Sequence, residues 1–79
     1  MPDTSQPPEL DLSQYAVSNI LSSGTSITHY GLVARNGSWY ILEEDTTNGT
    51  YMYNTGTSSY TTAWTNRKTA TYNYFYVEF

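Results

Sequence analysis

An Asn-Gly pair between two runs of β-forming residues is the feature that most restricts the fold of this chain. Asn36 and Gly37 separate residues 27–35 from residues 38–43, and both flanks are rich in β-branched and aromatic side chains. Asn-Gly in this setting is the strongest short-range hairpin signal, because a type I′ turn needs positive φ at both central positions. The sequence therefore predicts an antiparallel hairpin closed by a two-residue turn.

Further turn signals extend this hairpin into a meander. A turn at residues 47–49 leads into a strand at residues 50–54, which a second turn at residues 55–58 ends. Residues 71–79 form an aromatic, β-branched run that we expect to return as a strand and pair with the meander. The predicted fold is mainly β, a small antiparallel sheet or open barrel made by a meander of four to five strands.

The segment between the third strand and the aromatic run has a mixed pattern. Tyr60, Ala63, Trp64 and Arg67 are spaced by three and four residues, which is typical of one or two helical turns. The many threonines of residues 60–67 favour a strand instead. We expect a short helix that carries Trp64 into the core.

The first part of the chain differs from the rest. All three prolines lie within residues 1–9, which is typical of an extended arm. We therefore divide the chain into an extended arm, residues 1–23, and an antiparallel β domain, residues 24–79. The apolar positions of the arm fit both a period of two and one face of a helix, so its conformation stays open. These positions are expected to contact a neighbouring subunit: Leu10, Leu12, Tyr15, Val17, Ile20 and Leu21.

Size and composition limit how such a domain is stabilised and what it binds. A chain of 79 residues forms one small, marginally stable domain, and it has no Cys and only one His, which excludes disulfides and Cys- or His-rich metal sites. Oligomerisation or docking on a partner remains. The net charge of −4 offers no basic footprint for nucleic acid. Neither a signal peptide nor a membrane-spanning segment is visible, so we expect synthesis in a host cytoplasm and no membrane partner.

The chain is rich in aromatic residues, with nine Tyr, two Trp and two Phe. Tyr and Trp are typical of interfaces, where one end of the ring is buried and the other is hydrated. We expect a subset to form the core and the contacts between subunits, namely Trp39, Tyr40, Trp64, Tyr72, Tyr74, Phe75, Tyr76 and Phe79. Alternatively, rings exposed on the sheet would form a platform for host-surface glycans.

Candidate catalytic groups are few. His29 would need a nucleophile and an orienting carboxylate beside it, whereas neighbouring strand residues point to opposite faces, so we interpret it as facing solvent or a partner. The acidic run at residues 43–45 lacks the pattern of a calcium loop and is interpreted as a strand end. We expect no catalytic residues and no cofactor. Arg67 is predicted to pair with a carboxylate such as Glu43 or Glu78.

Three stretches together resemble a known class of proteins. They are residues 31–45, which contain a Gly-Ser-Trp-Tyr-Ile hairpin, residues 60–67 with Ala63-Trp64, and the aromatic run 72–79. This pattern is similar to small β-rich virion proteins of tailed bacteriophages, of the capsid-decoration, fibre or tail-associated type. The resemblance covers about residues 30–79. It implies a non-enzymatic structural subunit of the virion, a homo-oligomer that contacts other virion proteins through its arm and its strand edges.

Overall fold

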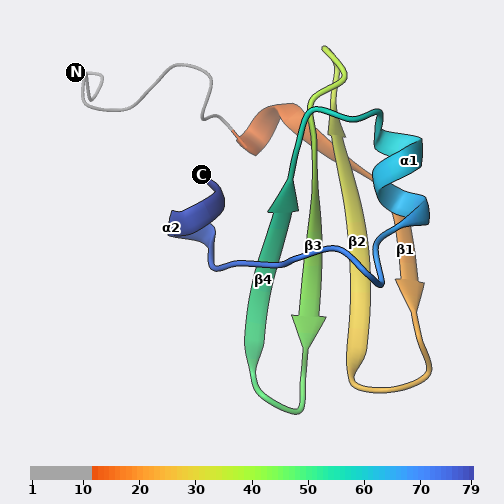
Figure 1. The fold of residues 1–79 in the computed structure, drawn as a ribbon, viewed down its shortest axis with the longest axis vertical. Coiled ribbons are helices and arrows are strands. Elements are labelled where there is room, and N and C mark those ends of the chain that lie inside the picture. Colours follow the sequence, from red (N-terminus) through yellow and green to blue (C-terminus); the bar gives the residue numbers. More distant parts are fainter. Residues whose placement is uncertain (1–11) are drawn as a thin grey trace.

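The computed structural model describes residues 12–79 and confirms a mainly β fold (Figure 1). Its four strands form one open antiparallel meander in the order β1-β2-β3-β4. The strands are β1 (Tyr15–Ser22), β2 (Ile27–Ala34), β3 (Trp39–Asp45) and β4 (Thr50–Thr55). A 3₁₀ turn, η1 (Leu12–Gln14), precedes β1, and two short helices, α1 (Tyr60–Thr65) and α2 (Phe75–Glu78), follow β4.

The predicted hairpin forms, but its turn is not of type I′. Val33 of β2 faces Trp39 of β3. Gly37 has a φ of 93°, whereas no residue other than glycine in the described part of the chain has positive φ, so Asn36 does not adopt the conformation that a type I′ turn requires. Instead the Asn36 side chain accepts a hydrogen bond of 2.9 Å from the Ser38 amide. Asn36 therefore acts as a local Asx cap of a four-residue loop.

The predicted boundary between arm and domain is wrong for residues 15–22. This segment is strand β1, which pairs antiparallel with β2 from Tyr15 opposite Ala34 to Ser22 opposite Thr28. Gly24, at the predicted boundary, lies in the tight connection between these two strands and has a φ of 79°. Of the two conformations that the apolar positions allowed, residues 15–22 adopt the strand, which corresponds to the period of two. Leu10 lies outside the described residues.

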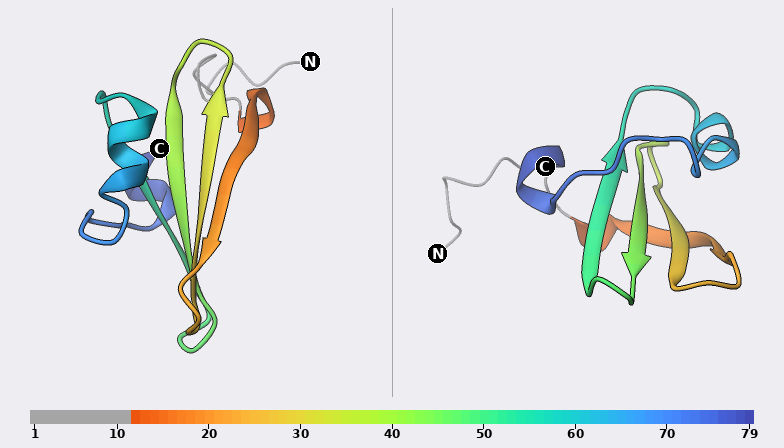
Figure 2. Two further views of the ribbon diagram at one scale, coloured as in Figure 1. Left: turned by 90° about the vertical axis from the view of Figure 1, so that its right-hand side faces the viewer. Right: turned by 60° about the horizontal axis from the view of Figure 1, so that its bottom comes forward.

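Helix α1 confirms the short helix expected near residue 60. Its N-cap is Ser59, whose hydroxyl accepts a hydrogen bond from the Thr62 amide. Asn66 ends the helix, and the chain then turns back across the sheet. Figure 2 shows α1 and this returning segment on one side of the sheet, which we call the covered face. Ala63 is the buried residue of the helix.

The core lies between the covered face and α1. Trp39 and Ile41 of β3 are buried together with Ala63, and Ile41 is fully inaccessible. The Trp39 indole donates a hydrogen bond of 2.7 Å to the Ser58 carbonyl, which satisfies its polar atom. Partly buried side chains complete the cluster, namely Val33, Tyr60, Trp64 and Tyr72.

The aromatic end of the chain does not form the predicted strand. Asn73 makes an isolated antiparallel bridge with Tyr53, and the chain then turns into α2. The helical turn puts Phe75 and Phe79, four residues apart, on the same side, where their rings stack at 4.8 Å. Both rings also pack edge-on against Tyr53. An extended strand would also point these two rings to one side, but about twice as far apart along the chain.

The Glu78 carboxylate binds α2 to β4, and we expect the stability of the protein to fall in acid for this reason. Burial raises its pKa, but hydrogen bonds from Asn73 and from the hydroxyl and amide of Thr55 outweigh this, so the pKa lies below its usual range. Because the pKa of Glu78 is lower in the folded state than in the unfolded state, where it is near 4.5, the ionised carboxylate stabilises the fold above that pH. This stability is lost as the pH falls through the folded-state pKa. We expect the urea midpoint to fall between pH 6 and pH 3, and to fall less in Glu78→Gln. An equal fall in both proteins would contradict this role.

Candidate interaction surface

The face of the sheet opposite α1 is only partly covered by the residues that the structure describes. The rings of Tyr15, Tyr53 and Phe79 pack on Tyr40, and together they close one end of this face. Beyond this cluster, three rows of paired residues continue across the strands. We call the uncovered part the open face; it consists of Val17, Ile20, Tyr30, Leu32, Leu42, Glu44 and Tyr51, together with the polar residues Ser22 and Thr28 in the same row as Glu44.

The open face is mainly apolar and is strongly exposed toward the ends of its rows. Ile20 on β1 is 61% exposed, Val17 54%, and Tyr51 on β4 55%. Leu32 and Leu42 lie between them and are half-buried. A sheet normally buries its apolar face against a second layer. The open face therefore has the composition of a surface that another protein covers.

Glu44 is the one charged residue of the open face, and two tyrosines hold it in place. Its carboxylate accepts hydrogen bonds from the Tyr30 hydroxyl at 3.1 Å and the Tyr51 hydroxyl at 3.2 Å. These hydrogen bonds to Glu44 raise the pKa of both tyrosines, so both hydroxyls stay protonated at neutral pH. The charge is thus satisfied within the chain, which lowers the cost of covering the face.

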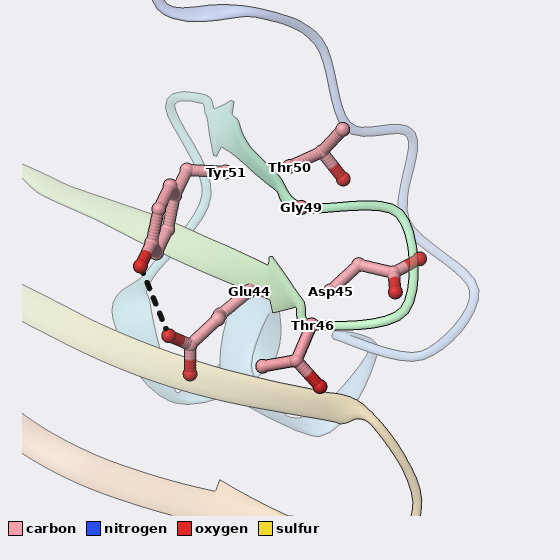
Figure 3. A pocket seen from close by; sticks show the side chains of 6 residues that line it. All are labelled: Glu44, Asp45, Thr46, Gly49, Thr50 and Tyr51. Atoms are coloured by element: carbon pink, nitrogen blue, oxygen red, sulfur yellow. Dashed lines mark hydrogen bonds between the residues drawn. The ribbon is translucent and has the colours of Figure 1, made fainter.

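Beside Glu44, the turn between β3 and β4 encloses a shallow open hollow of about 240 Å³ (Figure 3). Figure 3 shows the Glu44 carboxylate turned toward Tyr51 and the Asp45 side chain turned toward the turn. Asp45 accepts hydrogen bonds from the amides of Thr47 and Asn48, and the bonds from Asn48 are the main cause of its lowered pKa. Within residues 12–79, no three His, Asp or Glu side chains gather to hold a metal ion. Of the acidic run, Asp45 ends β3 and shapes the turn through these bonds, whereas Glu43 contacts His29 and Glu44 accepts hydrogen bonds from two tyrosines.

The two edges of the sheet differ in protection. On β4, the Tyr53 amide and carbonyl bond to Asn73, and the Thr55 amide donates to the Glu78 carboxylate. Along the outer edge of β1, no segment of residues 12–79 is paired. β1 contains no charged residue and no proline, and its side chains are exposed at Val17, Ile20 and Leu21. An exposed apolar edge strand accepts another strand readily.

The prediction that His29 faces solvent or a partner is wrong. This residue lies on the covered face, is only 4% exposed, and has its Nε2 atom 3.0 Å from the Glu43 carboxylate. The Tyr72 ring lies over it, with the ring centres 5.6 Å apart. Burial, followed by the nearby Glu43 carboxylate, raises the pKa of Tyr72 well above its usual range. A substrate cannot reach the His29 ring unless the core opens.

The predicted ion pair of Arg67 is absent. No carboxylate of residues 12–79 lies within ion-pair distance of it, because Glu43 contacts His29 and Glu78 contacts Asn73. The guanidinium instead lies 4.6 Å above the Trp64 ring and donates to the Trp64 carbonyl. The Arg67 carbonyl also accepts a hydrogen bond of 2.7 Å from the Tyr72 hydroxyl. Arg67 thus stabilises the segment after α1 by a cation–π contact.

The structure separates the predicted aromatic residues into three groups. Trp39 is buried in the core, where Trp64 and Tyr72 pack against it. Tyr40, Phe75 and Phe79 belong to the ring cluster at the end of the open face. Tyr74 and Tyr76 are exposed, with nearly parallel rings 6.3 Å apart. The two tryptophans therefore do not form an exposed sugar platform.

Of the predicted arm contacts, the described ones lie in η1 and β1. Leu12 is half-buried in η1, Tyr15 packs on Tyr40, and the other three are the exposed large apolar residues of β1. Sequence reasoning missed the contributions of β2, β3 and β4 to the open face. The alternation of Tyr30 and Leu32 with His29 and Gly31 carries that signal, but it needs the strand register to be read.

Comparisons of the chain with protein-family models, with curated proteins and with solved structures find no match. None of the helices in residues 12–79 has the length and the apolar character needed to cross a membrane.

Proposed function

We propose that this protein is a non-enzymatic structural subunit of a bacteriophage virion, of the decoration, fibre or tail-associated type. In this proposal it docks by its open face on an apolar surface of another virion protein. The open face carries the proposal, because it presents apolar side chains from all four strands and its one charge is already hydrogen-bonded. The virion context rests on the resemblance of residues 30–79 to small phage structural proteins.

The chemistry of the partner follows from the open face. The partner must offer a largely uncharged surface, because a charge placed against Leu42 or Leu32 would lose its hydration without gaining a partner. Tyrosines such as Tyr51 fit the core of a protein interface, where their rings are buried and their hydroxyls bonded. Basic nucleic-acid contacts have no counterpart on this face.

Incorporation into virus particles tests this function. We expect the wild-type chain to be present in purified virions of the phage that encodes it, as measured by mass spectrometry. Leu42→Lys and Tyr51→Ala should reduce its copy number at least tenfold, because the first places a positive charge in the apolar part of the open face and the second removes a ring from it. Thr57→Lys, in an exposed loop, is the control and should be incorporated normally.

Each result decides between assembly and its alternatives. Circular dichroism must first show that the variants keep the wild-type fold. Absence of the wild-type chain from purified particles would overturn the proposal, as would normal incorporation of both open-face variants.

Glycan recognition is the second candidate, and the exposed, stacked pair Tyr74 and Tyr76 favours it. Parallel rings that face solvent can stack on the apolar face of a sugar ring. In that case Tyr76→Ala should abolish binding to a panel of bacterial surface glycans while incorporation continues. Under the structural proposal, Tyr76→Ala has no effect on either measurement, because Tyr76 lies outside the open face.

A further inference from the structure

The unprotected edge of β1 points to a specific partner. Natural sheets usually protect an edge by charges, prolines, bulges or a covering segment. The β4 edge has such protection, from Asn73 and Glu78. Within residues 12–79, the only such protection of β1 is a bulge, a register shift between Val17 and Asn19. Beyond this bulge, residues 19–22 pair regularly with β2, so they offer an ordered strand edge.

The regular part of β1 is held firmly in the sheet. The side chain of Asn19 accepts a hydrogen bond of 2.7 Å from the Tyr60 hydroxyl of α1, which ties the strand to the helix. Next to it, Ile20 lies on the open face and Leu21 on the covered face, and both are exposed. An ordered edge needs little further ordering when it pairs, which favours association.

The charge distribution favours a second copy of the chain as the occupant of this edge. Residues 12–34 contain no Asp, Glu, Lys or Arg. Two copies of a chain with a net charge of −4 repel each other elsewhere, but not at this strand. An uncharged edge also gives a charged partner nothing to recognise. The same apolar side chains on both sides make the edge complementary to itself.

We propose that β1 pairs antiparallel with β1 of a second copy about a two-fold axis. The two four-stranded sheets then form one continuous sheet. This inference rests on the proposed function and specifies how the subunit associates with itself. Because Asn73 and Glu78 already occupy the β4 edge at Tyr53 and Thr55, the pairing closes at a dimer and does not continue into a fibre. The two open faces then lie side by side on one surface.

The size of the contact sets the expected affinity. Eight residues of strand are roughly 26 Å long, and a sheet with side chains is about 10 Å thick, so the contact strip covers a few hundred Å² per copy. Stable interfaces of standard size bury about 800 Å² per partner. We therefore expect a dimer that forms in the micromolar range and dissociates on dilution.

Light scattering at several concentrations tests the pairing on the full chain. The mass should rise from 9.0 kDa toward twice that value with increasing concentration. Leu21→Lys should weaken dimerisation at least tenfold, because it places like charges across the axis while leaving the open face unchanged. Thr57→Lys and Leu42→Lys should dimerise like the wild type. A wild-type mass that stays monomeric would overturn the proposal, as would loss of the dimer only in Leu42→Lys.

Cysteines introduced one at a time locate the two-fold axis of the dimer, because the natural chain contains no cysteine. Cysteine at residue 19, 20 or 21 should give a disulfide-linked dimer under mild oxidation for at least one position. Cysteine in place of Thr57 should not. Crosslinking at none of the three β1 positions would contradict the pairing. A monomer that still enters virions would overturn the pairing alone, whereas a dimer that is absent from virions would overturn the proposed function alone.

Discussion

Replacement of Trp39 by alanine is expected to remove a large part of the free energy of unfolding of the protein. The side chain is buried at the centre of the core, and the indole donates to the Ser58 carbonyl. Truncation of a buried Trp costs about 3–5 kcal/mol. A domain of this length has a total stability of roughly 4–12 kcal/mol. The loss should appear in urea unfolding followed by circular dichroism, as a large fall in the midpoint.

Two further variants separate packing from hydrogen bonding at this position. Trp39→Phe keeps a ring in the core but loses the hydrogen bond, and should cost less than the alanine variant, because a larger part of the packed volume remains. Tyr76→Ala removes a ring that is 80% exposed and should shift stability by less than about 0.5 kcal/mol. A Trp39→Ala protein with the wild-type midpoint would show that the core does not lie between β3 and α1.

Replacement of Gly31 by alanine is expected to have the second large effect. The Tyr60 ring lies directly on Gly31, so a Cβ atom there would come within 2.7 Å of the ring carbon Cζ and still closer to the hydroxyl. The hydrogen bond from this hydroxyl to Asn19 holds the ring in place. Overpacking of this kind costs about 1–3 kcal/mol. The cost should be measured as a lowered urea midpoint.

A double-mutant cycle with Tyr60→Ala shows whether the ring is the cause. In the Tyr60→Ala background, Gly31→Ala should cost almost nothing, because the space is empty and alanine restricts the unfolded chain more than glycine does. The same loss in both backgrounds would contradict the contact between β2 and α1.

Local patterns predicted those parts of the fold that depend on neighbours in sequence. Gly37 and Gly49 mark the two turns correctly, since each has the positive φ that glycine allows. The spacing of Tyr60, Ala63 and Trp64 predicted α1, whose cap, Ser59, is also local. Trp39, expected either in the core or in the contacts between subunits, lies in the core, on the same face of β3 as Ile41.

Other features depend on contacts between residues far apart, which a pattern does not contain. The aromatic run 72–79 has strand composition, but stacking of Phe75 on Phe79 and the bond of Glu78 to Thr55 stabilise a helical turn instead. The apolar positions of residues 15–22 fit both a strand and a helix, so these residues were assigned to the arm and not to a strand of the sheet. Arg67 was assigned a carboxylate from its charge alone, whereas the Trp64 ring lies closer in space.

Amide hydrogen exchange at low and high protein concentration tests most directly the central claim, that the chain assembles through β1 while β4 is closed. The account predicts that protection of residues 15–22 rises with concentration, while protection of residues 50–55 stays constant. Exchange at β4 that slows with increasing concentration would contradict this claim. So would unchanged exchange in both strands over the concentrations at which the mass is measured by light scattering.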